Sequence, residues 1–332
     1  MSTAGHRRAL IAGITGQDGA LLTQLLLQRG YAVSGLVRHS GVVDRSRLEA
    51  LDVADRVTLL PADLGDAASL ARIIAAAAPD EIYNFAAQSS VARSFVEVGP
   101  TIALNTLSLV NLLEATRVAA GGARFYQASS SEMFGNADHL PIDEATPMRP
   151  VSPYGISKAA AHQIATHYRE AHGMFVACGI LFNHESALRP AHFVTKKIIA
   201  AAVRIAGGGD ERLKLGDLAI RRDWGYAPDY VAAMAAMLQQ DEPADYVICS
   251  GAAHSLEEFV AASFAALGLD WRRHVDSDPS LRRPTEIAVT YGDAGRARRR
   301  LGWTYERGFA EMIGQLVRDE AALQRGDAVI GV

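Results

Sequence analysis

The stretch Ala9-Leu-Ile-Ala-Gly-Ile-Thr-Gly-Gln-Asp-Gly19 decides how this chain of 332 residues folds. Its apolar start, up to Gly13, is typical of a short strand buried on both faces of a sheet. Gly16 and Gly19 follow at three-residue spacing, and Gly19 opens a predicted helix over residues 19–29. Glycines in a turn between a first strand and a first helix let backbone N–H groups approach a pyrophosphate. The sequence therefore predicts a dinucleotide site in this turn, which also contains Gln17 and Asp18.

Strand-like and helix-like segments alternate through the first half of the chain. Short apolar runs predict further strands over residues 32–37, 57–60, 81–87, 124–129 and 175–182. Segments with helical periodicity lie between them, over residues 67–78, 102–119 and 153–172. This alternation predicts an α/β fold with a doubly wound parallel sheet and helices on both faces, the Rossmann arrangement.

The pattern loosens after residue 183. Helices are expected over residues 194–205 and 230–239, one more buried strand over 246–250, and no strong strand beyond 255. We expect residues 1–184 and 223–251 to form the dinucleotide-binding domain. Residues 185–222 and 252–332 would then form a smaller lobe that binds the substrate.

The end of the second predicted strand indicates which dinucleotide is bound. An NAD-binding protein usually has an acidic side chain there, which accepts a hydrogen bond from the ribose 2′-hydroxyl. This strand ends instead on Arg38-His-Ser40, so a 2′-phosphate could be held by Arg38 and Ser40, and NADP is predicted. The alternative is that Arg38 is only an exposed cation. The other residues expected along the cofactor end the third and fourth strands: Asp63, Leu64, Ala86 and Ala87.

Tyr154 and Lys158 are spaced to act together. On a helix, residues at i and i+4 share one face and lie about 6 Å apart. A cation beside a phenol favours the phenolate, so we expect Lys158 to lower the pKa of Tyr154. Such a tyrosine can take a proton from a sugar hydroxyl while a hydride leaves the carbon beneath it.

Ser129-Ser-Ser-Glu132 follows the fifth strand, at the edge where ligands bind in parallel sheets. A dehydrogenase, epimerase or ketoreductase of this type needs only a hydroxyl, the tyrosine and the lysine. Glu132 adds a carboxylate that could take a proton from carbon and protonate a leaving hydroxyl, which together eliminate water. A protein that senses NADP without turnover would have no need for all of these groups.

Composition excludes several other classes of protein. The net charge of −4 implies no general affinity for nucleic acid or for anionic membranes. The sequence has neither a signal-peptide layout nor an apolar run of about 20 residues, so a cytoplasmic location without a membrane span is expected. Cys178 and Cys249 are too few for a disulfide framework and are expected to be buried thiols.

Two clusters of polar residues are expected to have no function. His162, His167 and His172 recur every five residues, so their rings point in different directions around a helix and do not converge on a metal ion. We expect them to be solvated or partly packed, and no metal site is predicted. The basic cluster over residues 296–300 is interpreted as a solvated helix face.

Several blocks resemble the GDP-mannose 4,6-dehydratase family, in family order over nearly the whole chain. They are Ile14–Gly19, Tyr126–Gly135, Ser152-Pro-Tyr154, Gly179–Ser186, Arg222-Asp-Trp-Gly225 and Arg283-Pro-Thr-Glu286. The resemblance implies a lyase that removes water from GDP-mannose with NADP regenerated at each turnover. It also implies a homo-oligomer, either a dimer or a tetramer.

The resemblance also implies roles for individual residues. Ser130 would bind the sugar O4, Glu132 would be the base at C5 and the acid for the C6 hydroxyl, and Tyr154 with Lys158 would deprotonate O4. His184 and Arg189 would help to bind NADP. The residues expected to line the GDP-sugar site are Ser89, Asn183, Val194, Lys197, Arg222, Arg283 and Glu286.

Three departures from the family pattern leave the sugar open. Ser130 stands where the family usually has threonine, residues 187–192 read Ala-Leu-Arg-Pro-Ala-His, and Val151 replaces a frequent arginine. Another GDP-sugar such as a GDP-heptose is therefore an alternative substrate, and an epimerase or 4-ketoreductase is an alternative activity.

Overall fold

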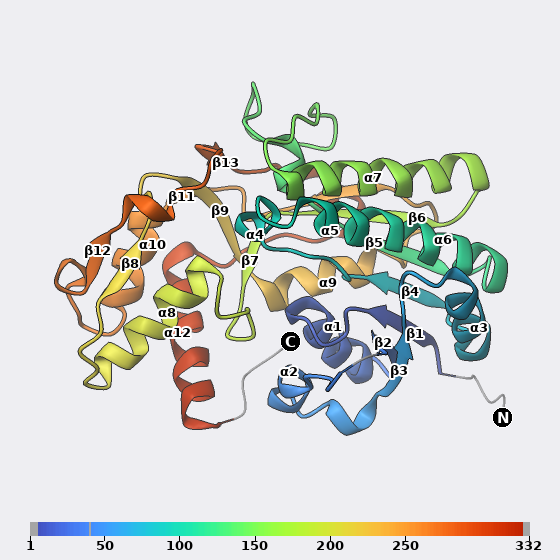
Figure 1. Ribbon diagram of the computed structural model, residues 1–332, viewed down its shortest axis with the longest axis horizontal. Coiled ribbons are helices and arrows are strands. Elements are labelled where there is room, and N and C mark those ends of the chain that lie inside the picture. The colour runs from blue at the N-terminus through green and yellow to red at the C-terminus, as the bar shows by residue number, and fades with distance from the viewer. Residues whose placement is uncertain (1–5, 40, 328–332) are drawn as a thin grey trace.

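A parallel sheet at the centre of the larger part of the molecule carries the site (Figure 1). In this computed structural model, which describes residues 6–39 and 41–327, its seven strands run in the order β10-β6-β5-β4-β1-β2-β3. They are β1 (Arg8–Ala12), β2 (Ala32–Arg38), β3 (Thr58–Ala62), β4 (Glu81–Asn84), β5 (Arg124–Ser130), β6 (Val176–Leu181) and β10 (Asp245–Ile248). The strand order reverses between β1 and β4, and ligands bind at such a switch point.

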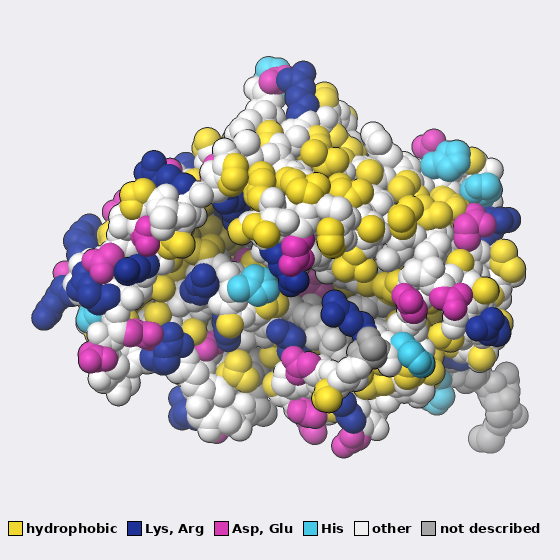
Figure 2. Space-filling view, viewed as in Figure 1, with side chains coloured by type: hydrophobic (Ala, Val, Ile, Leu, Met, Phe, Trp, Pro, Cys, Tyr) yellow, Lys and Arg dark blue, Asp and Glu magenta, His cyan; other side chains and the backbone are white. Residues whose placement is uncertain are grey.

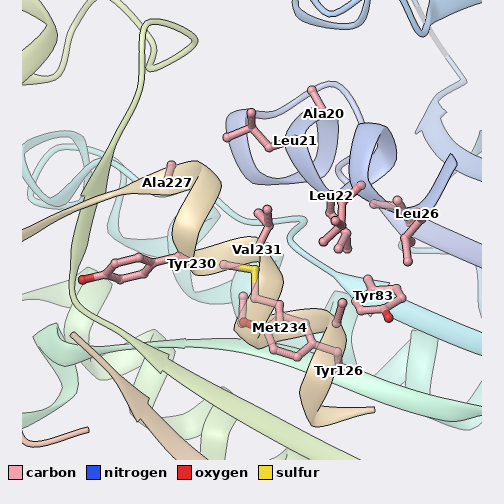
Figure 3. Packing of buried hydrophobic residues seen from close by; sticks show 14 of the residues in the cluster. Ala20, Leu21, Leu22, Leu26, Tyr83, Tyr126, Ala227, Tyr230, Val231 and Met234 are labelled. Atoms are coloured by element: carbon pink, nitrogen blue, oxygen red, sulfur yellow. The ribbon is translucent and has the colours of Figure 1, made fainter. Parts of the chain in front are cut away.

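Helices cover both faces of the sheet, as the sequence predicts. The cluster on one face combines the sheet with α1 (Gln17–Gln28), α2 (Ser46–Ala50), α9 (Ala227–Met237) and α11 (Gly295–Leu301). Figure 3 shows leucines of α1 facing Val231 and Met234 of α9, with Tyr83 and Tyr126 of the sheet beneath them. The opposite face is covered by α3 (Ala67–Ala77), α6 (Ser108–Ala119) and α7 (Pro153–His172).

The ends of α7 follow from local sequence. The Ser152 hydroxyl accepts a hydrogen bond from the Gly155 N–H, and Pro153 occupies the first helical position, where its missing N–H is harmless. Gly173 ends the helix in the left-handed conformation, at a φ of 63°. The predicted bounds of this helix, 153–172, are confirmed.

The smaller part is built around β9 (Arg221–Tyr226), which pairs with β7 (Asn183–Glu185), β11 (Ala253–Ser255) and β13 (Val289–Thr290). A second pair joins β8 (Leu213–Leu215) to β12 (Val275–Ser277). Its apolar core includes residues of α8 (Val194–Ala206), α10 (Leu256–Ala265) and α12 (Phe309–Arg325). The sequence did not predict β12 and β13, because strands of two or three residues are too short to show an alternating pattern.

The predicted helix over residues 102–119 is interrupted. The chain forms α4 (Val91–Ser94) and α5 (Val98–Ile102), then a π-helical turn over Ala103–Leu107, and only then α6. Such turns are frequent at functional sites.

None of the helices in the described residues is long and apolar enough to cross a bilayer. The division into two domains stays a prediction; β10 belongs to the large sheet, whereas β9 belongs to the smaller one.

Candidate active site

One large cavity opens at the carboxyl edge of the parallel sheet, against the smaller part of the molecule. It has a volume of about 1310 Å³, which is larger than the usual pocket for one small ligand. Every predicted site residue that the structure describes lines this cavity, whereas Ser40 lies outside the described residues. Figure 2 shows Lys and Arg side chains around the hollow between the two parts.

The glycine-rich turn is packed too tightly for larger residues. A Cβ on Gly19 would lie 2.3 Å from the Gly13 carbonyl oxygen, so the third glycine is needed for α1 to start against β1. Gly13 has a φ of +85°, and a Cβ there would lie 3.0 Å from the Ala86 nitrogen. The turn therefore brings bare backbone to the cavity beside the end of β4, which suits close approach of a pyrophosphate.

The side chains of Gln17 and Asp18 bind another part of the chain. The Gln17 amide donates to the His184 carbonyl oxygen at 3.2 Å and accepts from the Ser186 hydroxyl at 2.9 Å. An Asp18 carboxylate oxygen lies 3.0 Å from His184 Nε2. The glycine-rich turn is thereby linked to β7, which leads into the smaller part of the molecule. Sequence reasoning assigned Gln17 and Asp18 to the cofactor and did not find this link.

His184 and Asp18 form a buried ion pair. His184 Nδ1 lies 2.7 Å from the Phe182 carbonyl oxygen, so Nδ1 carries a proton. Nε2 faces the Asp18 carboxylate, but the angle of this contact is not that of a hydrogen bond. Burial opposes both charges, but the attraction between them prevails. The pKa of Asp18 is lowered to about 2, and the pKa of His184 is raised. The ring also stacks on Tyr230, with 5.0 Å between centroids.

Tyr154 and Lys158 face the cavity from α7. Lys158 Nζ donates to the Ala128 carbonyl oxygen at 2.6 Å, and the Ser130 side chain lies beside Tyr154 and acts to lower its pKa. Burial raises the pKa of Tyr154 to about 12 and lowers the pKa of Lys158 to about 8. The expectation that the ammonium brings the tyrosine pKa towards neutrality is therefore not met, because desolvation of the phenolate outweighs the groups that lower the pKa, Ser130 and Arg189.

Glu132 reaches the same cavity from a 3₁₀ turn that follows β5. The Ser130 hydroxyl accepts from the Glu132 N–H at 3.3 Å and so caps the turn Ser131–Phe134. Burial raises the pKa of the Glu132 carboxyl, although Arg222 and Arg283 act in the opposite direction. A carboxyl group with a raised pKa is suited to accept and to donate a proton near neutral pH.

The two arginines are held by a second carboxylate. Arg222 is buried and donates to Glu286 at 2.6 Å and to the Ile287 carbonyl oxygen at 2.7 Å, while Arg283 lies 3.4 Å from Glu286. Both arginines line the cavity, so this wall would attract an anion.

Asn105 is a structural residue of the site that sequence reasoning missed. From the π-helical turn its side chain accepts from the Gln88 N–H at 2.8 Å, and it donates to the Gln88 carbonyl oxygen at 3.1 Å and to the Ser157 hydroxyl at 2.9 Å. It therefore fixes the segment after β4 to α7, next to Tyr154. No local motif signals this role, since its partners are distant in sequence.

The expectation for the helix histidines is wrong for His162. This side chain is only 5% exposed, whereas His167 and His172 are exposed as predicted. The rings of His167 and His172 also lie edge to face, with 5.8 Å between centroids, so the expected separation holds only for His162. The spacing could not tell which ring faces the sheet. Cys178 and Cys249 are buried free thiols, as expected, and the residues Arg298, Arg299 and Arg300 are exposed.

Comparison with known proteins identifies the family. A sequence profile described as GDP-mannose 4,6 dehydratase matches residues 10–316. The chain belongs to the GDP-mannose 4,6-dehydratase family. GDP-mannose 4,6 dehydratase 1 of Arabidopsis thaliana is 44% identical, with 97% of this chain and 92% of the relative covered. The human GDP-mannose 4,6 dehydratase is 40% identical, with 96% and 92% covered. The chain is accordingly an enzyme of the hydro-lyase class, as the sequence predicts.

Solved structures confirm the fold of the extended short-chain dehydrogenases. The dTDP-glucose 4,6-dehydratase DesIV of Streptomyces venezuelae, with NAD and TYD bound, superimposes with a TM-score of 0.85 at 26% identity, covering 96% of this chain and 98% of the other. The UDP-glucose 4-epimerase of Thermus thermophilus gives 0.83 at 26% identity, with 95% and 98% covered. Dehydratases and epimerases share this fold, so the family profile, rather than the fold, separates these activities.

The ion pair between Asp18 and His184 predicts how stability depends on pH. A raised histidine pKa contributes stability that is fully present below about pH 6.5 and is lost as the pH rises through the folded value. A lowered aspartate pKa contributes stability that is present above about pH 3.9 and is lost as the pH falls towards 2. We expect urea unfolding of the wild type to lose on the order of 1 kcal/mol more stability than Asp18→Asn between about pH 6 and 8. Asp55→Asn, at an exposed carboxylate, is the matched control and should follow the wild type; parallel profiles for all three proteins would contradict the assignment.

Proposed function

We propose that this enzyme converts GDP-mannose to GDP-4-keto-6-deoxymannose with NADP as a resident cofactor. The observation that carries the proposal is the meeting of Glu132, Ser130, Tyr154 and Lys158 in one cavity at the carboxyl edge of the sheet. The names of the relatives support the same substrate, since proteins 37–44% identical over nearly the whole chain are GDP-mannose dehydratases.

The residues of the glycine-rich turn fit a dinucleotide. Gly13, Gly16 and Gly19 would hold the pyrophosphate through backbone N–H groups, and Asp63 and Ala86 line the cavity beside them. When bound, the nicotinamide would take a hydride from C4 of the sugar and return it to C6. Arg38 ends β2 at the cavity without an acidic neighbour in the strand, which supports NADP over NAD.

Tyr154 is the proposed base at the sugar O4. Ser130 lies beside the phenol and acts to lower its pKa, and the Ser130 hydroxyl can share the proton of the reacting oxygen. Lys158 is buried, and its pKa of about 8 lets its ammonium supply positive charge near neutral pH. The positive charge of an oxidised nicotinamide ring would add to that of Lys158. Together these charges would favour the Tyr154 phenolate, which burial opposes.

Glu132 is the proposed group for the elimination step. Once C4 is a ketone, the proton at C5 is acidified, and the Glu132 carboxylate can remove it. The same carboxyl group then gives a proton to the C6 hydroxyl, which leaves as water, so proton transfers balance within the step. The raised pKa of Glu132 favours this second transfer.

The basic wall of the cavity is proposed to hold the GDP moiety. Arg222, Arg283 and Lys197 offer N–H donors that suit a diphosphate, and Asn183 and Val194 extend the wall. Glu286 is also expected in the GDP-sugar site. Because its Oε1 is already engaged by both arginines, we propose that Glu286 orients them. Ser89, His184 and Arg189 line the same cavity, on the sugar and cofactor sides.

Glu132→Gln separates elimination from oxidation. The amide keeps the shape of the side chain but cannot take a proton from C5, so we expect water loss to fall by about 10²–10⁴-fold. Slow formation of reduced cofactor should persist. The assay incubates the protein with GDP-mannose and catalytic NADP⁺ and follows a product lighter by one water by mass spectrometry.

Glu170→Gln, on the exposed side of α7, is the matched control and should keep wild-type activity. Unimpaired dehydration by Glu132→Gln would remove this residue from the mechanism. If wild-type protein leaves GDP-mannose unchanged but dehydrates a GDP-heptose, the reaction stands and the sugar is wrong. Inversion or reduction of a 4-keto sugar without water loss would favour the epimerase or ketoreductase.

Arg38→Ala tests the choice of cofactor. Loss of a charge-assisted contact to a 2′-phosphate should weaken NADP⁺ binding by about 10–100-fold and leave NAD⁺ binding within about 2-fold. Isothermal titration calorimetry of both nucleotides measures this difference, with Arg56→Ala at another exposed arginine as the control. Equal losses for both nucleotides would count against a 2′-phosphate site at Arg38.

The homo-oligomer implied by the resemblance stays a prediction. Figure 2 shows hydrophobic side chains gathered over the helices above the sheet, and exposed apolar residues there include Val98, Leu107 and Ile156. Sedimentation analysis would test it, since a single monomeric species at micromolar concentration would contradict it.

A further inference from the structure

The side of α7 that carries Tyr154 and Lys158 continues to a third buried residue. Residues at i, i+4 and i+8 lie on one face of a helix, so His162 follows Lys158 by one turn. The three side chains are between 5% and 9% exposed. Each one meets the end of β5: Tyr154 lies beside Ser130, Lys158 donates to the Ala128 carbonyl oxygen, and His162 Nδ1 lies 2.8 Å from the Ser129 hydroxyl.

His162 connects this row to the far edge of the sheet. Its Nε2 lies 3.6 Å from Asp245 of β10, and Arg169, two turns further along α7, binds both oxygens of that carboxylate at 2.8 and 3.1 Å. Arg169 also donates to the Val176 carbonyl oxygen of β6 at 3.1 Å. The chain of contacts from Ser129 to Arg169 therefore ties α7 to three neighbouring strands.

A metal ion is the other explanation for such a group. Within the described part of the chain, ligand atoms of His162, Cys178 and Asp245 lie within 4.8 Å of one another. However, both oxygens of Asp245 are already bound by Arg169, and the other nitrogen of His162 is bound to Ser129. A divalent ion would also be repelled by the adjacent guanidinium. The contacts favour a hydrogen-bonded network.

We propose that His162 is a positioning residue for catalysis, which holds the end of β5 in register with α7 through Ser129. The inference rests on the proposed function, because it concerns the same reacting groups. Ser129 lies between Ala128, whose carbonyl oxygen accepts from Lys158, and Ser130, which lies beside Tyr154 and caps the turn of Glu132. A shift of Ser129 would therefore move the proposed base, its cation and the proposed acid relative to one another. Misplacement of reacting groups by about 1 Å costs about 10²-fold in rate.

Two substitutions at His162 separate its two contacts. His162→Asn places a polar atom near the position of Nδ1, so it can keep the bond with Ser129. His162→Leu removes the contacts with both Ser129 and Asp245, with little change in side-chain volume. We expect His162→Leu to lower kcat for GDP-mannose dehydration by about 10–100-fold with KM changed less than about 3-fold. His162→Asn should stay within about 5-fold of the wild type. His167→Leu, at an exposed histidine of the same helix, is the matched control and should behave as the wild type.

The pH profile distinguishes positioning from a general loss of stability. Charged groups that act on Tyr154 come from several elements: Glu132 after β5, Asp18 on α1, and Arg189. Lys158, one turn further along α7, faces the same cavity. If Lys158 moves away, the phenol ionises less readily, so the acid limb of kcat should move to higher pH by about one unit in His162→Leu. A merely structural histidine would lower the melting temperature and leave this limb in place.

Hydrogen–deuterium exchange provides a readout that does not depend on turnover. Faster exchange in the segment 125–134 of His162→Leu, with no change in a segment from the smaller part of the molecule, is expected. If His162→Leu does not fold, Ser129→Ala provides a second test, because it removes the bond between Ser129 and His162 from the side of the sheet. It should show the same loss of kcat and the same faster exchange in the segment 125–134. A folded His162→Leu protein with wild-type kcat, acid limb and exchange would overturn the proposal. Absence of any dehydration by wild-type protein would instead overturn the proposed function, and exchange would still test the network.

Discussion

The hydrogen bond from the buried ammonium of Lys158 to the Ala128 carbonyl oxygen is the contact on which the site depends. An ammonium removed from water without a partner is strongly disfavoured, so α7 must place Lys158 where the end of β5 offers an acceptor. Since the same helix face carries Tyr154 and His162, this single contact also sets where the phenol and the imidazole meet Ser130 and Ser129. The four-residue spacing along α7 therefore fixes where Tyr154, Lys158 and His162 lie relative to the end of β5.

A second set of contacts links the glycine-rich turn to the smaller part of the molecule. Gln17 and Asp18, which begin α1, bind residues of β7 and of the segment after it, while Arg47 from α2 donates to the carbonyl oxygens of Thr15 and Leu188. The turn that is proposed to hold the cofactor therefore cannot move independently of the segment that leads to α8. The charged pair of Asp18 and His184 stands at this junction. The attraction between the two charges offsets the cost of burying them, a cost that either charge alone would bear without that attraction.

Much of the sheet and of the cavity lining could be predicted from the sequence, because the signals are local. Strands buried on both faces appear as apolar runs, α7 has a visible cap at Ser152 and a visible end at Gly173, and the glycine-rich turn follows its strand directly. The short strands of the smaller part carry no such pattern. The π-helical turn at Asn105 and the burial of His162 depend on partners that are distant in the chain, so neither could be read from spacing. The pKa of Tyr154 was misjudged for a related reason: a motif gives the neighbouring charge but not the degree of burial.

The central claim is that one bound nicotinamide carries a hydride from C4 to C6 of the same sugar while Glu132 moves the protons. The most direct measurement is the fate of deuterium in GDP-mannose labelled at C4, followed by NMR and mass spectrometry of the product formed with catalytic NADP⁺. The account predicts that the deuterium is retained in the dehydrated product and lies on the C6 methyl group. A dehydrated product that has lost the deuterium, so that the third hydrogen of its C6 methyl group comes from another source, would contradict it.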